Sequence, residues 1–263
     1  MRGLPVLIDT HVHLDAAEFD DDREQVIERA RAAGVGRFVV PAVERQGFDA
    51  VERLAANDPG VGHALGIHPL YTMRAEREDL DVLDQRLKTG RAIAVGEIGL
   101  DHYVTDVDRG VQLEFFAAQL RLAARHGLPV ILHVRRAIDP ILAQLRRIPV
   151  PGGIAHAFNG SRQQADILIG LGFKLGFGGS MSYRGSTRIR ELAASLPIAS
   201  IVLETDAPDI PPEWARDRRN EPANLARYAE ILAGLRGMRP EEVAEVTTRN
   251  ATEVLRWPSP LGA

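Results

Sequence analysis

Two histidines near the start of the chain are spaced as ligands of one metal ion would be. In the segment LPVLIDTHVHLD (4–15), Asp9, His11 and His13 follow the apolar run 6–8 with one residue between each. A β-strand projects residues i and i+2 from the same face, so all three side chains would point the same way. Neutral imidazole and carboxylate without sulfur suit Zn, Mn, Fe, Co or Ni. Taken alone, the pattern is equally typical of a strand edge.

Further histidines and carboxylates stand where later apolar runs end. They are His68, Glu97, His133, His156 and Asp206. A single histidine at such a place is more often exposed or hydrogen-bonded than a ligand, but the convergence of several on one rim is rarer by chance. Four of these imidazoles together with the two carboxylates exceed the three protein ligands of one catalytic zinc ion, whereas they suit two metals that share a carboxylate. Two-metal sites catalyse in-line displacement, which predicts a hydrolase.

The sequence lacks the residues that several other kinds of catalytic site require. Cysteine is absent and the sequence has no Gly-x-Ser-x-Gly motif, which excludes a thiolate nucleophile and a nucleophile elbow. Lys88 and Lys174 are the only lysines, so there are few candidates for a Schiff base. The net charge of −4 argues against a general basic surface for duplex nucleic acid, although it is compatible with a local basic groove.

Eight short apolar segments alternate with helix-like segments. The predicted strands are 4–12, 37–43, 61–69, 92–100, 129–134, 152–158, 173–179 and 200–208. Apolar residues recur with a helical period most clearly in 109–127, 136–148, 223–236 and 240–256. Gly34, Gly127 and Gly172 stand just before strands, as residues that end helices often do.

This alternation predicts an α/β fold, a single (β/α)8 TIM barrel formed by residues 1–263 as one domain. A doubly wound parallel sheet is the alternative, but the segment after the first strand reads DTHVHLD rather than a glycine-rich phosphate loop. Catalytic residues of such barrels lie at the carboxyl ends of the strands, which is where the histidines and carboxylates above stand.

Composition gives expectations about location. The absence of cysteine is typical of a reducing cytoplasm. No apolar run approaches the roughly 18 residues of a membrane span, and no segment resembles a signal peptide. We therefore expect a cytoplasmic protein that does not enter the membrane. The sequence leaves the oligomeric state open, a monomer included.

Three histidines are expected to have structural roles. His63 lies early in its strand, towards the amino end. His126 precedes Gly127 at a helix end, where a histidine complements the helix dipole. His102 is expected in a solvated loop.

Seven motifs occur in an order typical of one family. They are DTHVHLD (9–15), GIHP (66–69), GEIGLDHY (96–103), PVILHVRRA (129–137), HAFNG (156–160), ETDAP (204–208) and NEP (220–222). Through them the chain resembles the TatD-related metal-dependent hydrolases (TatD-like deoxyribonucleases) of the amidohydrolase superfamily, over about residues 6–256. GEIGLD together with ETDAP is highly specific, whereas Asp-x-His-x-His alone indicates only the superfamily.

The resemblance implies a (β/α)8 barrel that hydrolyses phosphodiesters with two divalent metals. The implied ligands are His11, His13 and Asp206 for one metal, His133 and His156 for the other, and Glu97 for both. Many related enzymes bridge their metals with a carboxylated lysine at the position of Glu97. The metals would lower the pKa of a bridging water and provide a hydroxide nucleophile, with Glu97 and Asp206 as catalytic residues. Zn, Mn, Mg, Co and Ni are all compatible with this set.

Other motif residues are expected to support this site. Asp206 would orient the attacking water or accept its proton. His68 and Arg135 are expected to bind the substrate phosphate, since a guanidinium binds phosphate in a bidentate manner; a solvated Arg135 is an equal alternative. Asp9 and Asp101 are expected to orient ligands or strand ends rather than to bind metal.

The loop 208–222 departs from the commonest pattern of the family. Four prolines and a charge cluster mark it as a long loop after the last strand. Asn220 and Glu221 are expected to fix it. Three arginines are candidates for contacts with a nucleic-acid backbone, or else a solvated charge run: Arg216, Arg218 and Arg219.

The leading hypothesis is a deoxyribonuclease that acts on DNA at single-stranded or frayed ends. The same site would also suit a carbon ester or amide, as in a lactonase, an amidase or an aminoacyl-tRNA deacylase. A metal-loaded scaffold that binds nucleic acid without hydrolysing it is a third hypothesis, which the presence of all six ligands disfavours.

Overall fold

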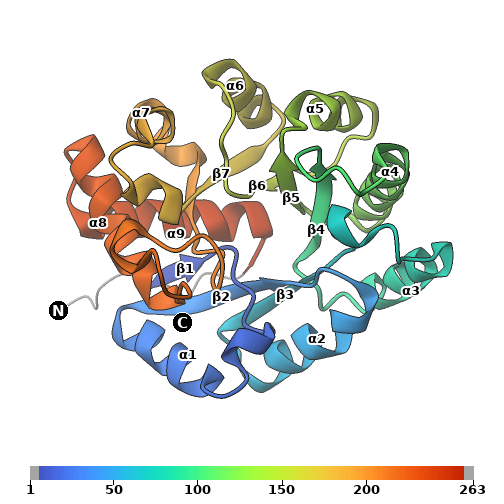
Figure 1. Ribbon diagram of the computed structural model, residues 1–263, viewed down its shortest axis with the longest axis horizontal. Coiled ribbons are helices and arrows are strands. Elements are labelled where there is room, and N and C mark those ends of the chain that lie inside the picture. Colours follow the sequence, from blue (N-terminus) through green and yellow to red (C-terminus); the bar gives the residue numbers. More distant parts are fainter. Residues whose placement is uncertain (1–5, 258–263) are drawn as a thin grey trace. The chain divides into compact units, whose positions relative to one another are not determined.

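Strands and helices alternate along the chain (Figure 1). The structure is a computed structural model that describes residues 6–257. The strands are β1 (Leu7–Asp9), β2 (Val35–Pro41), β3 (Val61–Leu65), β4 (Ala94–Asp101), β5 (Val130–Arg135), β6 (Gly153–Ala155), β7 (Phe173–Phe177) and β8 (Ile201–Leu203). The α-helices are α1 (Arg23–Ala32), α2 (Phe48–Asn57), α3 (Arg77–Leu87), α4 (Arg109–His126), α5 (Ile138–Arg147), α6 (Arg162–Gly170), α7 (Thr187–Ser195), α8 (Leu225–Arg236) and α9 (Pro240–Leu255).

The strands follow one another in the sheet in chain order, from β1 to β8. A helix follows each strand, and the neighbouring strands pair in parallel, as β4 does with β5. This order confirms the predicted (β/α)8 topology. It also differs from a doubly wound sheet, in which the strand order reverses at a switch point.

Several strands end earlier than predicted because the motif residues leave the ladder. The segment 61–69 is extended only over Val61–Leu65, and a 3-10 helix, Pro69–Tyr71, follows it. Pro69 has no N–H to donate to a neighbouring strand, so it cannot continue the ladder. The motif residues therefore lie in the turns just beyond the strands.

The chain consists of two compact units. Unit 2 comprises Pro41–His156 and Gly160–Phe173, with β3 to β6 and α2 to α6. Unit 1 comprises the other described residues, with β1, β2 up to Val40, β7, β8, α1 and α7 to α9. The expectation of one domain over 1–263 stays a prediction.

Helix α4 illustrates how local sequence fixes an element of unit 2. The Asp108 side chain accepts hydrogen bonds from the N–H groups of Gly110 and Val111 and so caps the first turn. Gly127 ends the helix with φ +64°, a left-handed conformation that glycine adopts without steric cost. Phe116, on the inward side of α4, is 1% exposed. Burial of a side chain of this size contributes about 1.5–3 kcal/mol.

Two buried glutamines connect α4 with backbone just after β3 and at the end of β4. Gln119 accepts a hydrogen bond from the N–H of Ile67 at 2.7 Å and donates one to its carbonyl at 3.0 Å. Gln112 makes the same pair of bonds with the backbone of Asp101, both at 3.0 Å. Because the two glutamines are seven residues apart, they lie on one face of the helix.

The register between β4 and β5 depends on a glycine. Gly99 is paired with His133, and a Cβ at Gly99 would stand 2.0 Å from the carbonyl oxygen of His133. Its φ of +154° also disfavours any other residue. This close approach brings Asp101 opposite Arg135.

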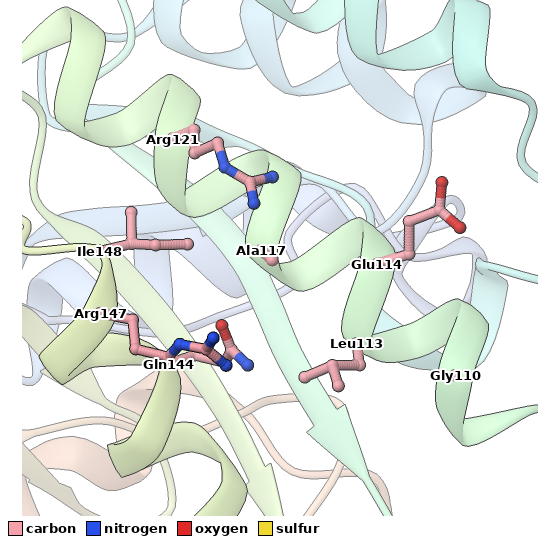
Figure 2. A pocket seen from close by; sticks show the side chains of 8 residues that line it. All are labelled: Gly110, Leu113, Glu114, Ala117, Arg121, Gln144, Arg147 and Ile148. Atoms are coloured by element: carbon pink, nitrogen blue, oxygen red, sulfur yellow. The ribbon is translucent and has the colours of Figure 1, made fainter.

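A groove of about 560 Å³ lies between α4 and α5 (Figure 2). Its lining consists of Gly110, Leu113, Glu114, Ala117, Arg121, Gln144, Arg147 and Ile148. None of the predicted site residues belongs to it. Separately, none of the helices within residues 6–257 has the length and hydropathy that crossing a bilayer requires.

Candidate metal centre

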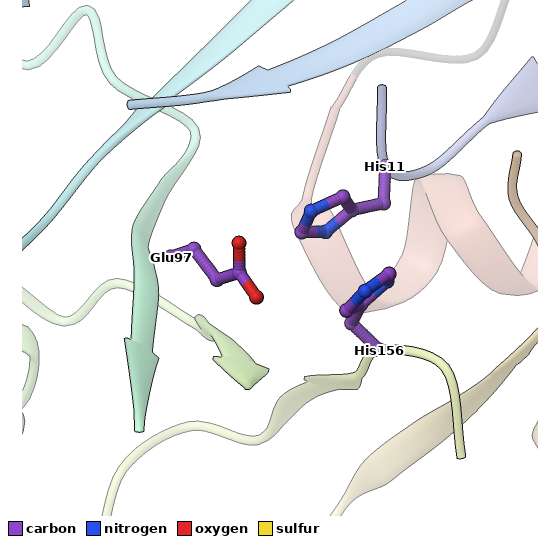
Figure 3. Close-up of side chains that lie close together, drawn as sticks. All are labelled: His11, Glu97 and His156. Carbon is purple, nitrogen blue, oxygen red and sulfur yellow. The ribbon is translucent and has the colours of Figure 1, made fainter. Parts of the chain in front are cut away.

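In unit 2, two predicted ligands lie close together, one within β4 and one just after β6. Glu97 is in β4 and His156 directly follows β6 (Figure 3). Their ligand atoms lie within 4.8 Å of one another, and the two residues are 2% and 5% exposed. A carboxylate and an imidazole that are both shielded from water are suited to bind one buried cation.

His133 stands between two carboxylates. Its Nδ1 lies 3.0 Å from Glu97 Oε1, and its Nε2 lies 3.0 Å from Asp101 Oδ2. Two ligand atoms on one ion at bond lengths of about 2.0–2.2 Å and angles of roughly 90–110° are about 2.8–3.6 Å apart, so Glu97 and His133 fit a shared metal. Asp101 then occupies the other ring nitrogen, as carboxylates that orient metal-bound histidines do.

The charges around His133 agree with this arrangement. Burial alone would lower the pKa of His133, but the hydrogen bonds to Asp101 and Glu97 raise it above its usual value. Burial would raise the pKa of Asp101, but the hydrogen bonds from His133 and from backbone N–H groups lower it to about 2. The imidazole therefore sits where positive charge is stabilised, and a divalent cation would meet the same field.

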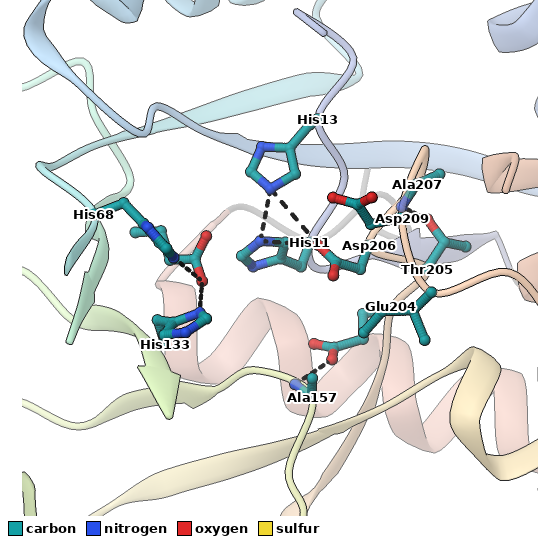
Figure 4. A network of polar contacts seen from close by, with 12 residues as sticks. His11, His13, His68, His133, Ala157, Glu204, Thr205, Asp206, Ala207 and Asp209 are labelled. Carbon is teal, nitrogen blue, oxygen red and sulfur yellow. Dashed lines mark hydrogen bonds and ion pairs between the residues drawn. The ribbon is translucent and has the colours of Figure 1, made fainter. Parts of the chain in front are cut away.

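His68 presents a hydrogen-bond donor rather than a lone pair. Its Nδ1 accepts a hydrogen bond from the N–H of Leu70 at 3.2 Å, so the neutral ring carries its proton on Nε2. That Nε2 lies 3.7 Å from Glu97 Oε1 (Figure 4). His68, Glu97 and His133 have the spacing of a ligand group, but the hydrogen bond at Nδ1 makes His68 suited to an anionic oxygen.

In unit 1, three further predicted ligands converge beyond β1 and β8 (Figure 4). His11 Nε2 and His13 Nε2 are 3.3 Å apart, and each lies 3.6 Å from Asp206 Oδ1. Three ligands of a tetrahedral ion at bond lengths of about 2.0–2.2 Å stand roughly 3.3–3.6 Å apart. These three residues therefore fit one divalent metal.

The backbone holds this triad in place. The N–H of Asp206 donates to the carbonyl of His11 at 2.8 Å, and the N–H of His13 donates to that of Ala207 at 2.8 Å. Asp206 itself has φ +59°, in the left-handed region that costs a residue with a side chain about 1–3 kcal/mol. Such strain is characteristic of functional positions, and here it occurs at a predicted ligand.

Asp9 supports the triad and is not part of it. Its carboxylate accepts hydrogen bonds from the N–H of His11 at 3.4 Å, from the N–H of Thr205 at 2.9 Å and from the Thr205 hydroxyl at 2.5 Å. Complete burial raises the pKa of Asp9 to about 8, against the effect of these hydrogen bonds. Asp9 thus links the segment that holds His11 to the one that holds Asp206, as the sequence predicts.

Sequence reasoning missed Glu204, which is 2% exposed. Its Oε1 accepts a hydrogen bond from the N–H of Ala157 at 2.5 Å, and Ala157 follows His156 with φ +44° (Figure 4). The position of Gly176 leaves room for this carboxylate, since a Cβ there would stand 2.0 Å from Glu204 Oε2. The signal in the sequence was a glutamate at the end of an apolar run, directly before Thr205 and Asp206.

The loop 208–222 is fixed to unit 1 as expected, by Asn220 above all. The fully buried Asn220 donates from Nδ2 to the carbonyls of Thr205, Asp209 and Ile210 at 2.8–3.1 Å. Its Oδ1 accepts from Tyr228 and Asn224 as well.

An ionic cluster fixes the end of the same loop. Glu221 pairs with Arg29 of α1, and Arg219 pairs with Asp22 and Glu221. Arg219 is therefore engaged within the protein, and the expectation of a nucleic-acid contact or a solvated charge run stays a prediction for it. Arg216 lies over the ring of Tyr183, 5.3 Å from its centroid.

The remaining histidines lie outside the ligand groups of the described chain. His63 is buried in β3, and its burial lowers its pKa. His126 lies 2.7 Å from Asp84 of α3 and so connects α3 with α4. His102 is half-buried rather than solvated, and its backbone N–H donates to the carbonyl of Arg135 at 2.8 Å.

Comparisons with known proteins identify the family of the chain. The family model described as TatD related DNase matches residues 8–256. The metal-dependent hydrolase YjjV of Escherichia coli is 39% identical over 254 residues, which cover 95% of this chain and 98% of YjjV. The 3'-5' ssDNA/RNA exonuclease TatD of Erwinia billingiae is 33% identical over 261 residues, with coverages of 96% and 100%.

A solved structure has the same fold. The crystal structure of YjjV from Escherichia coli superimposes with a TM-score of 0.93 and 38% identity, and covers 97% of this chain and 100% of that one. Agreement of this kind over almost the entire sequence confirms the fold predicted from the motifs. Together with the family match, it shows that the chain belongs to the TatD-related DNase family of metal-dependent hydrolases.

Proposed function

We propose that this protein is a metal-dependent phosphodiesterase that degrades single-stranded nucleic acid. The observation that carries the proposal is the spacing of the donor atoms. His11, His13 and Asp206 are spaced as the ligands of one ion, and Glu97 has His133 at 3.0 Å and a ligand atom of His156 within 4.8 Å. One divalent metal would be held by His11, His13 and Asp206, and the other by Glu97, His133 and His156. The sharing of Glu97 between the two metals is part of the proposal and rests on the sequence motifs.

Bound metals would supply Lewis acidity and a lowered pKa for water. The side chains of the protein position the water, accept its proton and bind the substrate. Asp206 orients the attacking water and accepts its proton, a role worth about 10²–10⁴-fold in rate. His68 donates its Nε2 proton to a phosphate oxygen, consistent with the hydrogen bond at its Nδ1. Arg135, half exposed at the end of β5, supplies positive charge for the backbone of the substrate.

The name of one relative supports nucleic acid as the substrate class. The Erwinia billingiae relative is named an exonuclease of single-stranded DNA and RNA, and it matches this chain over its full length. We extend that substrate class to this protein, with DNA first. The absence of cysteine supports a cytoplasmic location as part of the same proposal.

The experiment compares hydrolysis with and without metal. Purified protein is analysed for total divalent metal and then given a single-stranded oligonucleotide or an aryl phosphodiester, before and after chelation. Chelation should abolish both reactions, and readdition of one metal at a time should identify which of Zn, Mn, Mg, Co and Ni restores them. Asp206→Asn and His156→Gln should lose activity, whereas His126→Gln, which removes a histidine outside the centre, should retain it.

Two outcomes would contradict the proposal in different ways. Unchanged hydrolysis after chelation would remove the metals from the mechanism. Cleavage of carboxyl esters without cleavage of either phosphodiester would leave the metal centre in place and replace the nuclease by an esterase.

A further inference from the structure

An exposed tyrosine stands beside two arginines in the turns that follow β4 and β5. The side chain of Tyr103 is 48% exposed, and it is one of the few large hydrophobic side chains that are exposed in the described part of the chain. The guanidinium carbon of Arg135 lies 3.8 Å from the centroid of its ring, and that of Arg136 lies 4.7 Å from it. Both contacts are within the range of cation–π interactions.

The ring is held in position by its backbone. The N–H groups of Tyr103 and Val104 donate to Asp101 Oδ1 at 2.8 and 3.1 Å. The preceding N–H, that of His102, donates to the carbonyl of Arg135 at 2.8 Å. An exposed aromatic on a turn fixed at three successive N–H groups is a preorganised surface, because it loses little conformational freedom when a ligand stacks on it.

The same turn is tied to the metal centre. Asp101 binds the Tyr103 turn with Oδ1 and lies 3.0 Å from His133 with Oδ2. The side chain of Arg135 lies 3.9 Å from that second oxygen. A ligand on Tyr103 would therefore be placed at a fixed separation from a residue that we assign to a metal.

Three guanidinium groups lie around this turn although the whole chain carries −4. Arg109, the first residue of α4, donates to the carbonyl of His102 at 3.4 Å and adds a third guanidinium to Arg135 and Arg136. Of the acidic residues nearby, Asp101 is fully buried and Asp108 caps α4, whereas Asp106 is exposed. Aromatic rings combined with arginines bind the bases and the backbone of single strands, as a base in a duplex has no free face.

We propose that Tyr103, with Arg135 and Arg136, forms a subsite that stacks one unpaired nucleobase of a single-stranded nucleic acid. This inference rests on the proposed nuclease function and adds the feature of the substrate that is recognised, a base rather than the phosphate alone. The subsite reads no particular base, since every base has a π-face.

The test measures base-dependent binding in the absence of metal. A fluorescently labelled single-stranded DNA is titrated with metal-free protein in chelator and compared with a strand of equal length made of abasic nucleotides. Wild-type protein should bind the base-bearing strand about 5- to 150-fold more tightly, the effect of one stacked base. Tyr103→Leu should bind both strands equally, whereas Tyr103→Phe, which keeps the ring, should behave as wild type.

A matched control removes an aromatic ring elsewhere. Trp257 has the guanidinium of Arg37 at 4.8 Å from its ring, so Trp257→Leu deletes a similar pair and should leave the preference unchanged. Circular dichroism should show all variants folded, since Tyr103 is exposed. With metal present, Tyr103→Leu should raise KM for the oligonucleotide and leave kcat within about twofold, because stacking is made equally in ground and transition states.

The outcomes separate this inference from the proposed function. If Tyr103→Leu keeps the preference for bases, or wild type shows none in either binding or KM, the subsite is wrong while hydrolysis can still stand. If the preference is lost in Tyr103→Leu but no oligonucleotide is cleaved with any metal, the subsite stands and the nuclease function fails.

Discussion

Asp101 Oδ2 lies 3.0 Å from Nε2 of His133, on the neighbouring strand. The hydrogen bond leaves only Nδ1 of His133 for a metal, and it fixes the plane of the ring. Carboxylates in this position also make the imidazole a better electron-pair donor to the metal. Their removal therefore typically weakens metal binding about 10- to 100-fold.

Replacement of Asp101 should therefore weaken the metal site without removing a ligand. Asp101→Asn should lower metal affinity about 10- to 100-fold, measured by competition with a chromophoric chelator. Asp106→Asn removes an exposed carboxylate from the same turn and should leave the affinity unchanged. Equal affinities for Asp101→Asn and wild type would show that His133 is not oriented in this way.

Glu204 should stabilise the fold through a backbone group. In Glu204→Ala the N–H of Ala157 loses its acceptor, and an unsatisfied buried donor costs about 1–3 kcal/mol. Urea unfolding should register this loss, and metal affinity should fall too, because Ala157 directly follows His156. Glu204→Gln keeps an acceptor oxygen and should lie closer to wild type. Identical unfolding curves for Glu204→Ala and wild type would refute this role.

Asn220 should contribute more to stability than a typical polar residue. Asn220→Ala leaves three carbonyls without their donor, so we expect a loss of roughly 3 kcal/mol in the free energy of unfolding. Asn224→Ala removes one of the groups that bind Asn220 and should cost no more than about 1 kcal/mol. The loop would have to be held by other contacts if the two variants were equally stable.

The pairing of α3 with α4 should weaken in acid. Hydrogen bonds from Lys88 and His126 lower the pKa of Asp84 from 3.8 to about 2. The carboxylate is thus more acidic in the folded protein, so its stabilising effect is complete above the ordinary value and is lost as the pH falls from about 4 to about 2.

Unfolding of wild type and Asp84→Asn at several pH values checks this. The stability difference should be largest near neutrality and should shrink below about pH 4. Asp166→Asn, which removes an exposed partner of Arg162, should show almost no difference at any pH. A difference for Asp84→Asn that stays constant down to about pH 2 would contradict the expectation.

The spacing of residues along the chain was sufficient to predict the fold and the candidate ligands. His11 and His13 stand out because a strand has a period of two, and Asp206 because it ends an apolar run near the carboxyl end of the chain. The α-helices predicted at 223–236 and 240–256 agree with α8 and α9 within two residues. These features depend on local pattern alone.

Contacts between distant segments were not predictable in the same way. Gln112 and Gln119 look like ordinary polar residues of an amphipathic helix, and only the fold shows that they face inward to bind backbone. The hydrogen bond that sets the tautomer of His68 depends on the turn at Leu70. The stacking of Arg135 on Tyr103 depends on the register of β4 with β5, which a glycine sets through close approach.

The two glutamines of α4 have a mechanical consequence. Seven residues of helix span about 10.5 Å. At one end of that span Gln119 is hydrogen-bonded to the backbone of Ile67, and at the other end Gln112 is hydrogen-bonded to the backbone of Asp101. His68 follows the first peptide, and Asp101 carries the contact to His133. A displacement of α4 along its axis would shift His68 and Asp101 by the same amount, so the helix keeps the separation of these two residues constant.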